Sequence, residues 1–211
     1  MKLQRIEQKN LRDHYYLNGH DDCYYLLEYM PGEDFDYSEA NQLIPNFKKK
    51  RGASGWKYKG QAISKVAEYL EDAIDDLDLA GCTLVPIPPS KIKTNPQYDD
   101  RMTQVLNRLN SEGNLDVREI INAIEDRDAS HLSGDHRPKL DDLVENYELD
   151  LEECEELKST VVLFDDLITA GAHFKACKQV IQDAFPDIKV IGVFIARRVV
   201  PDPFSDFLDG V

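Results

Sequence analysis

The segment from residue 161 to residue 196 constrains the fold more than any other part of the chain. Residues 161–164 and 188–196 are two apolar runs, and residues 171–185 between them carry apolar side chains at helical spacing. Short, wholly apolar runs are typical of strands buried on both faces, and strands joined through a helix pair in parallel. The segment therefore predicts a βαβ unit and an α/β fold, with a parallel sheet flanked by helices.

Segments upstream extend this core. Residues 59–77 predict a helix, and residues 82–87 predict a strand that the two following prolines must end, because proline has no N–H to donate. The same patterns predict a helix over residues 102–109 and a strand over residues 120–124. We assign residues 58–211 to one core domain, a normal size for a single hydrophobic core.

Residues 1–57 are predicted to form a small, hood-like appendage. Two aromatic-rich runs, residues 14–17 and 23–29, flank an Asn-Gly-His-Asp-Asp turn and predict a β-hairpin. The basic run at residues 47–51 is interpreted as a solvated face rather than a binding patch.

The charge balance narrows the class of partner. The chain has 25 Lys and Arg against 40 Asp and Glu, a formal net charge of −15. Such a surface repels polyanions at long range, which disfavours direct binding of nucleic acid. A small phosphorylated ligand remains compatible, because a pocket can collect cations and backbone N–H groups against the global sign.

Cysteine usage and hydropathy indicate the compartment. The four cysteines are scattered with no C-x-x-C pair, so neither a zinc site nor a redox motif is predicted, and reduced thiols are expected. The first 16 residues lack an apolar signal core, and no stretch of ~18 apolar residues is present to cross a bilayer. We expect a cytoplasmic protein without a membrane partner.

The residues after the first apolar run of the βαβ unit carry its chemistry. Asp165 and Asp166 follow that run, and Thr169 and Gly171 stand in a turn of small residues that opens the helix. Ligands of parallel sheets bind beyond the carboxyl ends of the strands, and the free N–H groups of a helix N-terminus attract phosphate. The two carboxylates can accept hydrogen bonds from sugar hydroxyls.

This pattern resembles the signature with which type I phosphoribosyltransferases bind 5-phosphoribosyl diphosphate (PRPP): four aliphatic residues, two acids, an aliphatic, any residue, then a Thr/Ser-Gly turn. The resemblance implies that Asp165 and Asp166 bind the ribose hydroxyls and hold Mg²⁺ indirectly, through ribose or water. It also implies that the 5′-phosphate is wrapped by Thr169, Ala170, Gly171, Ala172 and His173. His173 replaces the usual Thr, and two alternatives stay open: its N–H binds phosphate, or it points away from the site.

Three further segments are compared with the ComF-like branch of this family, although its cysteine-rich zinc module has no counterpart here. The Leu-Val-Pro-Ile-Pro-Pro-Ser-Lys stretch resembles the pyrophosphate loop, which implies Ser90 and Lys91 as pyrophosphate ligands; a stiff connector is the alternative. The Tyr-Asp-Asp-Arg stretch at residues 98–101 stands where ComF-like chains usually carry a polar run, and this position implies that Arg101 is another phosphate ligand. Residues 127–137 resemble the catalytic flexible loop, whose cationic side chains would close over the diphosphate; a plain surface loop is the alternative. The residues concerned are Arg127, His131 and Arg137.

The resemblance implies a Mg²⁺-dependent phosphoribosyltransferase that joins PRPP to a nitrogenous acceptor not identified by the sequence. The alternatives are a non-catalytic regulatory protein that binds PRPP or a nucleotide, and an interaction protein that retains only the fold. A homodimer is left open.

Overall fold

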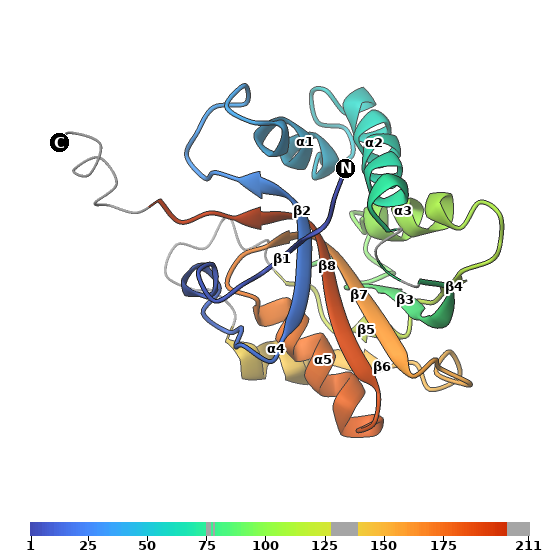
Figure 1. Cartoon of the computed structure of the whole chain (residues 1–211). Helices are drawn as coiled ribbons and strands as arrows, with labels where there is room; N and C mark the ends of the chain where they lie inside the picture. Colours follow the sequence, from blue (N-terminus) through green and yellow to red (C-terminus); the bar gives the residue numbers. More distant parts are fainter. Residues whose placement is uncertain (75–76, 78, 128–138, 202–211) are drawn as a thin grey trace.

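A computed structural model describes residues 1–74, 77, 79–127 and 139–201 (Figure 1). Its main sheet has six strands in the order β1-β2-β8-β7-β3-β4, and only the β1–β2 pair is antiparallel. The strands are β1 (Gln4–Arg5), β2 (Asp22–Tyr29), β3 (Thr83–Pro86), β4 (Asp116–Val117), β7 (Thr160–Ile168) and β8 (Lys189–Arg198). The prediction of an α/β fold with a parallel sheet flanked by helices is confirmed at this level.

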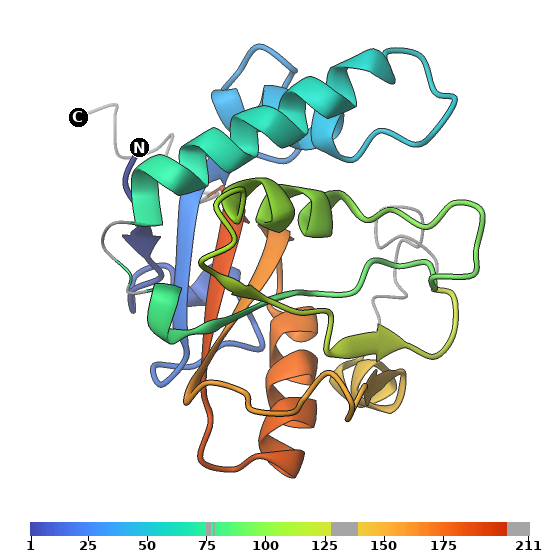
Figure 2. The same ribbon diagram turned by 90° about the vertical axis from the view of Figure 1, so that its right-hand side faces the viewer.

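Helices cover both faces of the sheet, as Figure 2 shows for α2 and α5. One face packs against α1 (Glu39–Phe47), α2 (Lys57–Ala73) and α3 (Arg101–Leu109). The other packs against α4 (Leu140–Glu145), α5 (Ala172–Ala184) and a small antiparallel sheet of β5 (Ile121–Ala123) and β6 (Tyr147–Leu149). Short 3₁₀ turns stand at Leu11–Asp13 and Leu79–Gly81.

The predicted βαβ unit forms β7, α5 and β8. Within β7, Val162 and Phe164 pack into the core on one face, whereas Val161 and Leu163 pack into the core on the other. This explains why the run is apolar throughout, since a strand alternates its side chains between two faces that are both buried here.

β7 continues past the apolar run, so the acid pair lies inside the strand. Asp165 pairs with Phe194 of β8, whereas β3 ends at Pro86, opposite Phe164. The two prolines after Ile87 prevent β3 from following, because they offer no N–H to the ladder. One edge of β7 is therefore released from strand pairing at the position of the two carboxylates.

The predicted N-terminal hairpin is wrong. Residues 14–17 form a turn, and β2 joins the main sheet in parallel with β8, with Tyr25 opposite Phe194. The polar groups of the turn bond instead to the segment before α5: His14 Nδ1 bonds the Thr169 carbonyl, and the Tyr16 N–H donates to the Ala170 carbonyl over 2.8 Å. A strand inside residues 1–57 is thus a member of the central sheet.

Within the described residues, no helix combines the length and the apolar character that crossing a bilayer requires. Cys23, Cys154 and Cys177 are buried thiols, in agreement with the expectation from their spacing.

Candidate functional site

A cleft of about 890 Å³ lies at the carboxyl ends of β3 and β7, between the sheet and the connection from α1 to α2. Nine cationic and four acidic side chains line it, although acids outnumber bases 40 to 25 in the whole chain. The local charge is therefore opposite to the global charge, and the cleft attracts anions. The cationic residues are Lys48, Lys49, Lys50, Arg51, Lys57, Lys59, Lys91, Arg101 and Arg127; the acidic ones are Asp99, Asp100, Asp165 and Asp166.

Asp166 is a buried carboxylate held by two cations. Lys48 Nζ lies 2.8 Å from its Oδ1, and the Arg101 guanidinium donates to its Oδ2 over 2.9 Å through Nε and 2.5 Å through Nη2. Burial alone would raise the pKa of Asp166, but the charges of Lys48 and Arg101 outweigh burial and hold this pKa well below its usual range. Asp166 is therefore ionised.

Asp165 has the opposite electrostatic character. Burial and then the neighbouring charge of Asp166 raise the pKa of Asp165 to about 7. Its Oδ1 accepts a hydrogen bond from the Asp166 N–H over 2.7 Å. Two adjacent carboxylates in one strand thus differ strongly in proton affinity, because the cations contact only one of them directly.

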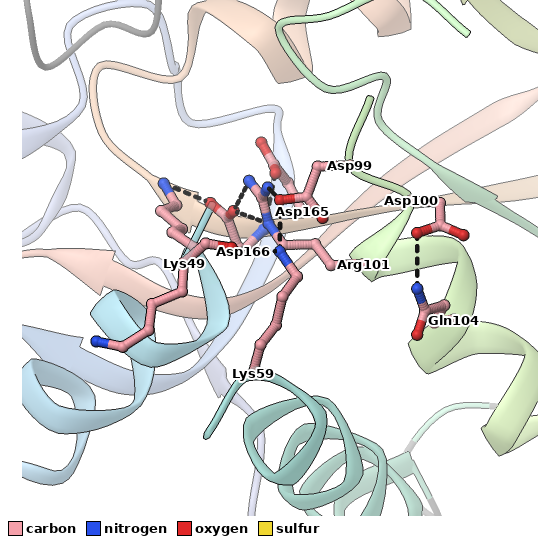
Figure 3. Close-up of polar contacts among 9 residues, drawn as sticks. Lys49, Lys59, Asp99, Asp100, Arg101, Gln104, Asp165 and Asp166 are labelled. Carbon is pink, nitrogen blue, oxygen red and sulfur yellow. Dashed lines mark hydrogen bonds and ion pairs between the residues drawn. The ribbon is translucent and has the colours of Figure 1, made fainter. Parts of the chain in front are cut away.

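Arg101 connects the acid pair to the helical layer. Its Nη1 lies 2.6 Å from Asp99 Oδ2, and Lys59 Nζ of α2 lies 2.6 Å from the same oxygen (Figure 3). Lys59 is only 5% exposed and also donates to the Lys49 carbonyl. Arg101, which is predicted to bind pyrophosphate, therefore lies in the cleft with its guanidinium between the carboxylates of Asp99 and Asp166.

The turn before α5 has a fixed backbone shape. Gly171, the N-cap of α5, has a φ of 85°, and a Cβ there would lie 2.9 Å from the Leu17 side chain. Glycine is favoured on both counts. The carbonyls of Thr169 and Ala170 already accept hydrogen bonds from residues 14–17. What the turn can offer a ligand is the Thr169 hydroxyl and the free N–H groups of the first helical turn.

His173 faces the cleft, where its ring contacts two polar side chains. Tyr147 Oη lies 2.8 Å and Arg127 Nη1 lies 3.1 Å from Nδ1. Burial, followed by the charge of Arg127, lowers the pKa of His173 to about 3, so the ring is neutral. The same Arg127 nitrogen lies 3.4 Å from Nε2, and because a guanidinium can only donate, one of the two ring nitrogens accepts from it while the other carries the ring proton.

Arg127 stands at the start of the predicted flexible loop. Its guanidinium lies 5.2 Å from the centre of the Tyr147 ring and donates to the Pro89 carbonyl, while its backbone N–H donates to the Ser90 carbonyl over 2.7 Å. This brings Arg127 together with Ser90 and Lys91, all three of which line the cleft. His131 and Arg137 lie outside the described residues.

The sequence interpretation missed one wall of the cleft. The basic run at residues 47–51 was interpreted as a solvated face, yet Lys48 bonds Asp166, and Lys49, Lys50 and Arg51 line the cleft. A cluster of four consecutive cations in so acidic a chain was the available signal. No local pattern marked Lys59 or Tyr147, because each acquires its polar partners only in three dimensions.

The described residues contain no group of three acids, histidines or cysteines placed to hold a metal ion. Mg²⁺ commonly needs only one or two carboxylates when phosphates and water complete its coordination. The donor set fits such an ion: Asp165 lacks a direct cationic partner among the described residues, and a nearby divalent cation would favour its ionised form.

Fold and site together define an α/β protein with a mostly parallel sheet and an anion-attracting cleft at the carboxyl ends of its strands. No protein-family model matches the chain, and a search of curated proteins found no significant similarity.

Proposed function

We propose that the protein binds PRPP in this cleft and transfers its phosphoribosyl group to a nitrogenous acceptor in a Mg²⁺-dependent reaction. The observation that carries the proposal is the position of the Asp165–Asp166 pair, Thr169 and His173 on one wall of a cleft rich in cations, whereas Ala170, Gly171 and Ala172 do not line it. A sugar with phosphates at both ends needs this combination of acceptors and cations.

The donor would lie along the carboxyl end of β7. Its 5′-phosphate would bind the Thr169 hydroxyl, the N–H groups that open α5 and the ring N–H of His173. Its ribose hydroxyls would donate to Asp165 and Asp166. Its diphosphate would lie beside Ser90, Lys91 and Arg127, which all line the cleft.

In the transfer step, a nitrogen lone pair of the acceptor forms the new bond to ribose C1. The bond from C1 to the diphosphate oxygen breaks, its electrons leave with pyrophosphate, and a proton of the acceptor nitrogen passes to water. Lys91 and Arg127 would stabilise the charge that builds on the leaving group. Asp165 and Asp166 would hold Mg²⁺ indirectly, through ribose or water, and the ion would supply Lewis-acid stabilisation of the same diphosphate.

One observation favours a second candidate, a regulatory protein that binds PRPP or a nucleotide without turnover. Both oxygens of Asp166 are occupied by Lys48 and Arg101, so a ribose hydroxyl must compete with an ion pair. A protein that only senses its ligand could use this competition to move the α1–α2 connection.

Pyrophosphate release decides between the two candidates. The pure protein is incubated with Mg²⁺, PRPP and a panel of nitrogenous bases, and PRPP binding is followed separately by thermal shift. Pyrophosphate release with at least one base supports the transferase. Binding without release on the whole panel supports the regulatory protein. If PRPP does not raise the Tm, or if Asp165→Asn/Asp166→Asn responds like the wild type, the site assignment is wrong.

A further inference from the structure

The α1–α2 connection supplies cations that the proposed donor does not use. Lys48 and Lys59 are neutralised by Asp166 and Asp99. In contrast, Lys49, Lys50 and Arg51 line the cleft without an ion pair to any described carboxylate. In Figure 3 the Lys49 side chain points away from the acid pair. Lys57 at the start of α2 lines the cleft in the same way, and four uncompensated cations in a chain of net charge −15 indicate a second place for negative charge.

An aromatic side chain stands in the same wall. Trp56 lines the cleft and is 40% exposed, and Lys59 Nζ lies 5.3 Å from the centre of its ring. A large exposed ring beside cations is suited to stacking on a flat heterocycle, whose π-face it can cover.

The cleft is large for a small-molecule site. Its volume of about 890 Å³ lies near the upper end of the ~300–1,000 Å³ range of small-molecule sites. Asp165, Asp166 and Thr169 belong to the sheet side, whereas Trp56 and the cations at positions 49–51 belong to the α1–α2 connection. A donor on the sheet side leaves the other wall for the acceptor.

We infer that the acceptor is an anionic aromatic heterocycle, stacked on Trp56, with its carboxylate or phosphate bound by Lys49, Lys50 and Arg51. The assignment of this ligand as the acceptor rests on the proposed transferase function. The binding site itself, for a flat ring with a negative charge, does not depend on turnover.

Trp56 is the only tryptophan of the chain and reports directly on this site. Its fluorescence is titrated with matched ligands, corrected for their absorbance: uracil against uracil-6-carboxylate, pyridine-3-carboxamide against pyridine-3-carboxylate, and adenosine against AMP. We expect at least one anion to bind ~10-fold or more tightly than its neutral partner, since several cations each contribute a modest amount. The three pairs distinguish a carboxylate from a phosphate.

Two triple variants separate the effect of the cations at positions 49–51 from the effect of the net charge of the protein. Lys49→Gln/Lys50→Gln/Arg51→Gln should abolish the preference for the anion. Lys2→Gln/Lys9→Gln/Lys158→Gln, an equal charge change at residues that do not line the cleft, should preserve it. By calorimetry, Trp56→Phe should bind the preferred anion within about threefold of wild type, and Trp56→Ala should bind it at least tenfold more weakly.

Equal affinities within all three pairs would overturn the inference, as would equal losses in the two triple variants. The PRPP thermal shift is measured on the same samples. If PRPP binds but no pair shows a preference, the inference fails and the proposed function survives. If an anion binds at Trp56 but PRPP does not bind, the proposed function fails and the anionic ring site stands.

Discussion

The two walls of the cleft are built on different principles. On the sheet side, Asp166, Arg101 and His173 are held by short contacts to residues distant in sequence, and little freedom remains. On the α1–α2 side, Lys50, Arg51 and Trp56 are exposed. A preorganised wall suits a fixed donor, and an adaptable wall suits a ligand that defines specificity. Substitutions should therefore affect stability on the first wall and ligand choice on the second.

The largest effect is expected at Asp166. Asp166→Asn leaves Arg101 and Lys48 beside a neutral amide in a buried site, and breaking such a network costs about 3–5 kcal/mol of unfolding free energy. Urea denaturation measures it. The control is Asp126→Asn, whose carboxylate is exposed and should cost less than about 1 kcal/mol. Equal losses would mean that the sheet wall is not rigidly built.

Gly171→Ala should cost about 2–3 kcal/mol, because it combines a left-handed φ with a Cβ 2.9 Å from Leu17. Gly32→Ala is the matched control, with a φ of 90° and no atom within 4 Å of the added Cβ. It should lose only the backbone contribution, about 1 kcal/mol. Equal losses in the two variants would mean that the close contact with Leu17 does not contribute to the cost of Gly171→Ala.

The pH dependence tests the asymmetry of the acid pair. The pKa of Asp165 is raised to about 7 from 3.8, so between these values the folded state binds more protons than the unfolded state. The contribution of Asp165 to stability is therefore full below pH 3.8 and is lost progressively as the pH rises from there to about 7. Asp165→Asn should flatten this part of the stability profile, measured by urea denaturation at several pH values. An unchanged slope would contradict the raised pKa.

The smallest effect is expected at the contact between the walls. Lys48→Gln removes one of two cations from Asp166 and should cost about 1 kcal/mol in thermal denaturation, because Lys48 is 26% exposed and partly screened by water. The control is Lys65→Gln, which breaks a more exposed pair with Glu39 and should cost at most about 0.5 kcal/mol. A loss at Lys48 no larger than at Lys65 would mean that this ion pair does not join the walls.

The regular part of the fold was predictable from the sequence. Its βαβ unit, the strand ended by prolines and the helices before and after that strand carry periodic patterns, which arise because each element buries a defined face. Residues 14–17 misled the prediction because aromatic residues favour strands in general. There, hydrogen bonds to the turn before α5 decided the conformation.

The sequence by itself determined that two acids follow the apolar run of β7 and that a glycine turn opens α5, since those features are local. Only the tertiary structure decided that Arg101 bonds an acid 65 positions away, that Tyr147 contacts His173, and that a basic run forms a cleft wall. Periodicity records which face of an element is buried, but not which elements meet. The long-range partners of a charged side chain follow from packing, and here they give two adjacent carboxylates opposite pKa shifts.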